Sequence, residues 1–165
     1  MDEWHDFFLA ASGAAAVLAG LVFVGVSINL DMIVANPRYG LTGRALEALV
    51  LLVAVLIVTI LLLVQAQGTV VAGVEVLVVG ITDWAAIVAI QLLQLRNWRS
   101  LEATLRGHFV ARVVLGQVAV LPLVAAGIAV LSWGVSGLYL LVAGVVLSFL
   151  VAVEGAWVLL VEIHR

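Results

Sequence analysis

An acid and a tryptophan, Asp83 and Trp84, stand side by side in a long aliphatic stretch that reads GITDWAAIVAI. A charged side chain at the centre of a lipid bilayer costs about 2.5–3.5 kcal/mol on insertion scales, so it usually faces a bundle interior or a water-filled cavity. Asp83 could bind a proton or a cation there. It could equally be a neutral acid that donates one hydrogen bond and holds helices together. Trp84 would pack in a constriction in the first case and between helices in the second.

Other polar residues lie on the same side of the helix that this stretch predicts. Glu75 and Thr82 project within about 20° of each other when successive residues turn by about 100°. Asp83 and Gln94 form a second such pair roughly 80° further round, and Gln91 lies on the same half. This polar arc is a candidate lining for a pore or cavity. A polar seam between packed helices or subunits would give the same pattern.

Two more acids and a proline are candidates elsewhere. Glu154, in the last apolar stretch, is the second site candidate, and we expect an arginine from the membrane boundary to reach it. Glu47 follows Arg44 by one helical turn, a spacing that predicts an ion pair within one helix. Pro122 interrupts another apolar stretch, where proline kinks a helix and frees a backbone carbonyl. It is a candidate hinge, although a static kink would look the same in sequence.

No motif in the sequence indicates an enzyme. The chain has no cysteine and no recognisable nucleophile–base pair, phosphate-binding loop or glycine-rich dinucleotide motif. His108, His164 and Glu162 could approach one another, but their spacing matches no metal-ligand motif. We therefore expect no catalytic residue, no cofactor, no bound metal and no nucleic acid partner.

The composition indicates what kind of protein must position these residues. Of 165 residues, 66% are hydrophobic and only 10% are charged, whereas soluble domains carry about a quarter charged residues. Apolar runs of about 20 residues, the length that crosses a bilayer as a helix, recur along the whole chain. The sequence therefore predicts an all-α integral membrane bundle with a single domain, residues 1–165.

Five transmembrane helices are predicted. They cover approximately residues 7–30, 44–66, 70–95, 109–132 and 136–161. The leader MDEWHD before the first helix is acidic, whereas a secretory signal begins with basic residues, so we expect this segment to stay in the mature protein.

The distribution of arginine indicates the orientation. All basic residues apart from histidine are arginines, and a five-span arrangement puts them on one side: Arg38, Arg44, Arg96, Arg99, Arg106, Arg112 and Arg165. The positive-inside rule makes that side cytoplasmic, so the N-terminus lies outside and the C-terminus inside. The short, uncharged connections on the other side, QAQGT and SWGVSG, predict that spans two and three form one hairpin and spans four and five another.

The stretch Phe23–Leu52, FVGVSINLDMIVANPRYGLTGRALEALVLL, resembles small, uncharacterised multi-span integral membrane proteins of high-GC bacteria. The resemblance covers the first span, the Asn36–Pro37 turn and the arginine-led second span. A composition dominated by alanine, valine, glycine and leucine, in which all basic residues apart from histidine are arginine, suggests such a genome. The bacterial inner membrane is therefore the expected location, while the resemblance implies no activity and no site residue.

Thin five-helix bundles have little room for an enclosed substrate cavity, so we expect a homo-oligomer surrounded by lipid. Small residues at Ser12, Ala16 and Gly20 would let the first helix pack closely. Our first hypothesis is a cation- or proton-conducting channel in which the polar arc lines the pathway and Asp83 is a selectivity ring or proton-binding group. The alternative is a non-conducting interaction or regulatory subunit, or an assembly factor, of a larger membrane complex, whose polar arc binds another transmembrane protein.

Overall fold

The computed structural model describes residues 4–30, 41–64, 68–95 and 103–161, and within these ranges the chain is helical, with no strand. The helices are α1 (His5–Ile28), α3 (Leu41–Leu62), α4 (Thr69–Leu95), α5 (Ala103–Trp133), the short 3-10 helix η4 (Gly134–Gly137) and α6 (Leu138–Val161). Each long α-helix overlaps one of the apolar ranges expected from the sequence, and the ends differ by a few residues.

Helices are the expected form for these segments because aliphatic side chains leave the backbone as the main polar group, and a helix satisfies its own backbone hydrogen bonds in lipid. The helix α5 continues through Pro122 rather than ending there. It ends before Gly134, which has a φ of 67°. Glycine adopts this left-handed conformation without steric strain and is the usual residue just after a helix.

Four stretches of the described chain are long and apolar enough to cross a membrane, judged by length and composition. They are His5–Ile28, Thr42–Leu62, Thr69–Leu95 and Phe109–Trp157. The fourth contains most of α5 together with η4 and most of α6. These features are those of a multi-pass membrane protein.

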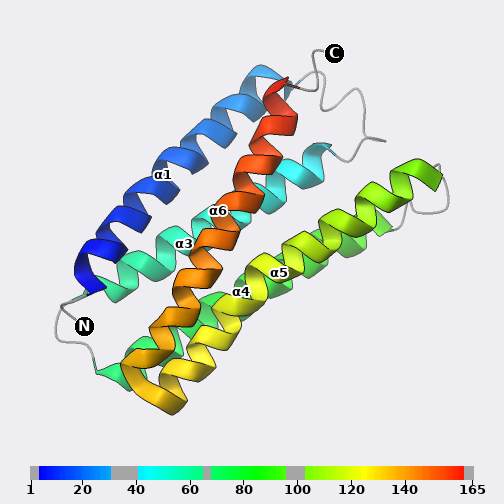
Figure 1. Ribbon diagram of the computed structural model, residues 1–165. Helices are drawn as coiled ribbons and strands as arrows, with labels where there is room; N and C mark the ends of the chain where they lie inside the picture. Colours follow the sequence, from blue (N-terminus) through cyan, green and yellow to red (C-terminus); the bar gives the residue numbers. More distant parts are fainter. Residues whose placement is uncertain (1–3, 31–40, 65–67, 96–102, 162–165) are drawn as a thin grey trace.

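The five long helices pack side by side, and successive helices run in opposite directions (Figure 1). Each of them contacts its two neighbours around the bundle, and α3 and α6 also contact each other across it. The helix α4 packs more extensively against α5 than against α3. The main partner of α4 is therefore the helix that follows it, in addition to the α3–α4 hairpin expected from the short connection.

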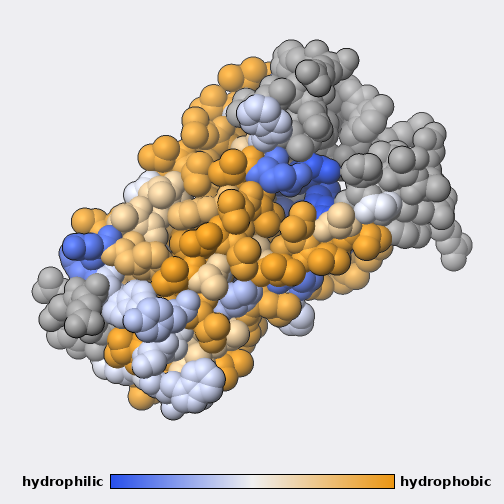
Figure 2. Space-filling view, viewed as in Figure 1, coloured by the Kyte–Doolittle hydropathy of each residue, from blue (hydrophilic) through white to orange (hydrophobic). Residues whose placement is uncertain are grey.

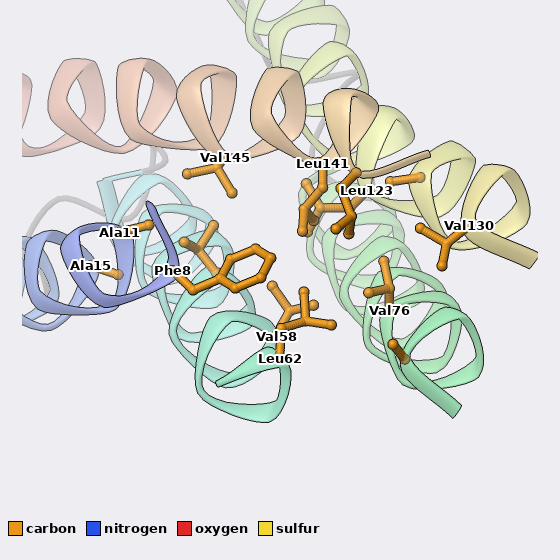
Figure 3. Close-up of a cluster of buried hydrophobic side chains, with 14 residues drawn as sticks. Phe8, Ala11, Ala15, Val58, Leu62, Val76, Leu123, Val130, Leu141 and Val145 are labelled. Carbon is orange, nitrogen blue, oxygen red and sulfur yellow. The ribbon is translucent and has the colours of Figure 1, made fainter. Parts of the chain in front are cut away.

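Apolar side chains cover most of the face shown in Figure 2, with hydrophilic residues gathered in a few places. Inside, the largest core cluster takes residues from all five long helices, and Phe8 of α1 points between α3 and α6 (Figure 3). We call this part of the bundle, built around Phe8, Leu62, Val76, Val130 and Leu138, the apolar end. We call the opposite part, where Arg44, Glu47, Arg112 and Glu154 meet, the charged end.

The small residues of α1 do not pack as expected within this chain. Its buried residues are Phe8, Ala11, Ala15, Val22 and Gly25. Ala16 and Gly20 are exposed, and a Cβ added at Gly20 would meet nothing within 4 Å. Among the described glycines, the close contacts lie on α3, α4, α5, η4 and α6.

Some of the residues used to argue the orientation lie outside the described part of the chain. These are Arg38, Arg96, Arg99 and Arg165. The backbone of Arg106 is described, as part of α5, but its side chain is not. Arg44 and Arg112 are described, and both lie at the charged end.

Candidate functional site

Asp83 lies near the midpoint of α4, on the face that the helix turns toward the bundle. The buried residues on this face are Ala72, Gly73, Val76, Gly80, Asp83, Ile87 and Gln91. Asp83 is only 4% exposed. Neither of its carboxyl oxygens has a hydrogen-bond partner among the residues that the structure describes. This differs from the usual situation, in which a buried polar group is hydrogen-bonded.

Asp83 is one of the residues that line a groove of about 330 Å³ between α3 and α4, and its two carboxyl oxygens are buried beneath the surface of this groove. The α3 wall is Leu49, Val50, Val53, Ala54 and Ile57, and the α4 wall is Val78, Val79, Thr82, Asp83 and Ala86. Thr82 and Asp83 are its only polar lining residues. The rim is open to the surroundings, because Val53, Ile57 and Val78 are exposed. Since an apolar rim faces outward on a membrane helix, the groove opens toward lipid.

Such surroundings are unfavourable for an isolated charge. A carboxylate in an apolar environment needs a partner of opposite charge or several hydrogen-bond donors to offset its lost hydration. The described residues around Asp83 supply neither. The site can therefore accept a proton, a cation or a hydrogen-bond donor that arrives from outside the chain.

A second polar group joins α4 to α5 toward the charged end. The indole Nε1 of Trp84 donates to Oε1 of Gln117 at 2.9 Å, and Nε2 of Gln117 donates to Oε1 of Gln91 at 2.9 Å. Trp84 itself is 42% exposed. The tryptophan is thus held by a side-chain hydrogen bond between two helices at mid-depth, and Gln117 is the central residue of the chain of contacts.

Two ion pairs connect helices at the charged end. Nε of Arg112 lies 3.2 Å from Oε2 of Glu47, and both side chains are buried. Nη1 of Arg44 lies 3.4 Å from Oε1 of Glu154, whose side chain is 51% exposed. The pairs join α3 to α5 and α3 to α6.

The partner of Glu47 corrects the expectation from sequence. An ion pair with Arg44, one turn away on the same helix, was expected, but Glu47 pairs with Arg112 of α5. Arg44 reaches Glu154 instead, which agrees with the expectation that a boundary arginine would approach that acid. The physical reason is that Arg112 offers Glu47 a buried partner, so Arg44 remains available to the more exposed carboxylate.

The residues of the predicted polar arc of α4 differ in how far they are buried within this chain. Asp83 and Gln91 are buried, whereas Thr82 is exposed and its hydroxyl donates to the carbonyl of Val78 at 2.8 Å. Glu75 is partly buried nearer the apolar end. Gln94 lies at the opposite end of α4, where it contacts α3.

The Nε2 atom of Gln94 is buried and has no hydrogen-bond partner in the described chain. It packs against Gly43 of α3 so closely that a Cβ on Gly43 would overlap the amide. Pro122, the candidate hinge, is partly buried within α5 and is followed by Leu123, which packs in the core.

Sequence reasoning overlooked Gln117 and the pairing role of Arg112. Gln117 was recognisable as a polar residue inside an apolar stretch, the same feature that identified Asp83. The side chains of the proposed histidine group are not available for comparison, because His164 and Glu162 lie outside the described residues, as does the side chain of His108.

Comparison with protein-family models, with curated protein sequences and with solved structures gives no match to this chain. Function is therefore argued from the geometry of the site.

Proposed function

We propose that α1, α3, α4, α5 and α6 each cross the membrane once, with the N-terminus outside and the C-terminus in the cytoplasm of a bacterium. Two observations support five spans. The stretch Phe109–Trp157 is divided by η4 into two helices, and each of these is longer than the about 20 residues that a span needs. Arg44 and Arg112 also lie at the same end of the bundle, which becomes the cytoplasmic end under the positive-inside rule.

We further propose that the protein is a non-conducting interaction subunit of a larger membrane complex. The observation that carries this proposal is the unpartnered carboxyl of Asp83 beside an apolar groove open at its rim. Intramembrane acids pair with other groups or line aqueous cavities. Because the lining of this groove is apolar apart from Thr82 and Asp83, another membrane protein is a better occupant than a column of water.

A homo-oligomeric cation or proton channel is the second candidate, and one observation favours it. The contacts Glu47–Arg112 and Gln91–Gln117 place polar side chains between the charged end and the middle of the bundle. Asp83 and Gln91 lie on the same face of α4, about 12 Å apart along the helix at 1.5 Å per residue. Protons could approach Asp83 from the charged end by this path.

The size of the protein in its own membranes tests the first proposal. We expect the wild type, extracted in mild detergent, to migrate in a complex larger than the protein purified alone. Asp83→Asn should shift it toward the smaller species. Thr82→Val is the matched control, because it alters the neighbouring groove residue but removes only a hydrogen bond within its own helix. Equal sizes for wild type and Asp83→Asn would contradict the proposal.

Flux measurements separate the two candidates. Purified wild type in liposomes should pass neither protons nor monovalent cations above the level of empty liposomes, over a range of pH and voltage. A flux that Asp83→Asn abolishes, carried by a uniform oligomer, would instead establish the channel.

A further inference from the structure

The groove between α3 and α4 has a size that suits a helix surface. Its wall residues run from Leu49 to Ile57 on α3 and from Val78 to Ala86 on α4. At 1.5 Å per residue each wall is about 12 Å long, a little more than two helical turns. A helix lying along it would present three side chains on one face, at spacings of i, i+4 and i+7 or i+8. Asp83 lies between the two ends of the α4 wall, so the central side chain would lie over Asp83 and would reach its buried carboxyl after a small change in the Asp83 side chain.

The chemistry of that central side chain follows from Asp83. Its carboxyl is buried, and it has no partner in the described chain. A lysine or arginine in the middle of another transmembrane helix also loses its hydration, and it needs an opposite charge at that depth to offset the loss. When the two meet in the groove, each offsets the desolvation of the other.

A second copy of this chain is a poor source of such a side chain. The sequence has no lysine, and its arginines lie outside the apolar middle of every helix. Arg112 comes nearest to the middle and is already paired with Glu47 of its own chain. The occupant must therefore be a different protein.

We propose that the α3–α4 groove binds a transmembrane helix of another protein that carries a lysine or arginine at mid-membrane, flanked one turn on either side by small or aliphatic residues. This inference rests on the proposed interaction function and names the chemistry of the partner. The apolar walls give the contact area, and Asp83 selects the helix that has the basic residue.

Synthetic helices test the selection directly. The probes are leucine–alanine transmembrane peptides of about 24 residues with a central lysine, leucine or glutamate. The full-length protein, labelled through Val17→Cys on the exposed side of α1, is reconstituted with each fluorescent peptide in phosphatidylcholine vesicles. Because the natural chain has no cysteine, this label is unique. We expect energy transfer to show binding of the lysine peptide at least about tenfold tighter than the leucine peptide.

Variants of the groove decide whether Asp83 causes the preference. Asp83→Leu should bind lysine and leucine peptides equally, and Asp83→Lys should prefer the glutamate peptide. Ala86→Phe fills the groove while leaving the acid in place, and we expect it to weaken binding of every peptide. Glu154→Gln removes an acid from the charged end and should change nothing, so it controls for general attraction of cations. Helix content and melting temperature are measured for each variant to show that it is folded.

Three outcomes would overturn the inference. They are equal binding of the lysine and leucine peptides by the wild type, a lysine preference that survives Asp83→Leu, and binding that Ala86→Phe leaves unchanged. Failure here is distinguishable from failure of the interaction function. If the peptides show no preference while Asp83→Asn still disrupts the natural complex, the function stands and the partner chemistry is wrong. If the peptides bind as expected but the natural complex does not depend on Asp83, the interaction function is wrong.

Discussion

The charged end and the apolar end of this bundle are held together in different ways. At the charged end, side chains of opposite charge reach between helices, as Glu47 does to Arg112 and Arg44 to Glu154. At the apolar end, helices approach until backbones touch. A Cβ added at Gly127 would lie 2.5 Å from the Cα of Leu77, and one added at Gly73 would lie 2.9 Å from Cγ of Leu131.

This difference indicates which part of the bundle is available to bind another transmembrane helix. Without a hydrophobic driving force between helices in lipid, association depends on close packing and on polar contacts. The apolar end depends on close packing, and the charged end adds ion pairs between helices to its packing contacts. Asp83 lies between the two ends: its carboxyl has no hydrogen-bond partner among the described residues, and the residue lines the α3–α4 groove. A binding role is therefore better supported for the middle of the molecule than for either end.

The largest effect is expected for breaking the buried ion pair. Glu47→Leu removes the carboxylate that lies 3.2 Å from the buried Arg112, and removing one member of a buried pair destabilises a protein by about 3–5 kcal/mol. The loss is read from the free energy of unfolding in detergent micelles or bicelles.

The double variant Glu47→Leu, Arg112→Met tests whether the ion pair itself stabilises the protein or whether the single variant is unstable only because it leaves one buried charge. Replacing both charges by apolar side chains should recover most of the lost stability, because the desolvation cost disappears with them. A double variant as unstable as the single one would show that the ion pair itself stabilises the charged end.

At the apolar end, Gly127→Ala should destabilise the protein by about 1–3 kcal/mol, because the added methyl forces the α4 and α5 backbones apart. Gly20→Ala is the matched control, since open space surrounds that position. It should be neutral or slightly stabilising, as alanine is the better helix former. Similar losses at both glycines would mean that helix flexibility matters here and close packing does not.

These contrasts also show what the sequence could predict. Long aliphatic runs sufficed to locate the helices, because in lipid the backbone has few alternatives. The sequence also predicts that Asp83, at the centre of α4, is buried, because a charged side chain is unfavourable in lipid, and the structure agrees with its burial. The members of the polar arc differ in burial within this chain, since Thr82 is exposed while Asp83 and Gln91 are buried, and a role of the arc as a lining stays a prediction.

Contacts between distant helices could not be predicted, because they depend on packing. Spacing rules favour Arg44 as the partner of Glu47, yet Arg112 lies closer once α5 is in place. Gly127 and Gly144 make close contacts within this chain and Gly20 does not, so close packing at Gly20 against a second copy stays a prediction. The groove exists only through the relative placement of α3 and α4.

A smaller effect is expected for Gln117→Leu, which removes the hydrogen bonds to Trp84 and Gln91. Hydrogen bonds between membrane helices contribute about 0.6 kcal/mol on average and up to about 1.7 kcal/mol, so we expect a loss of about 1 kcal/mol. The tryptophan emission spectrum should also shift, because the indole of Trp84 loses its acceptor. Ser132→Ala, which removes a bond to Ile128 within α5, controls for loss of a polar group and should leave the spectrum unchanged.

The smallest effect is expected for Glu154→Gln. Its side chain is 51% exposed and pairs with Arg44 at 3.4 Å, and exposed ion pairs contribute roughly 0.2–1 kcal/mol. If this end of the bundle lies at the aqueous boundary of the membrane, about 1 M salt should screen the pair and remove the difference from wild type. The same salt should not rescue Glu47→Leu, whose destabilisation comes from a buried charge that ions do not reach. A salt-resistant loss on Glu154→Gln would mean that the charged end is closed to solvent throughout, and the two ion pairs would then have to be treated as one buried group of four charges.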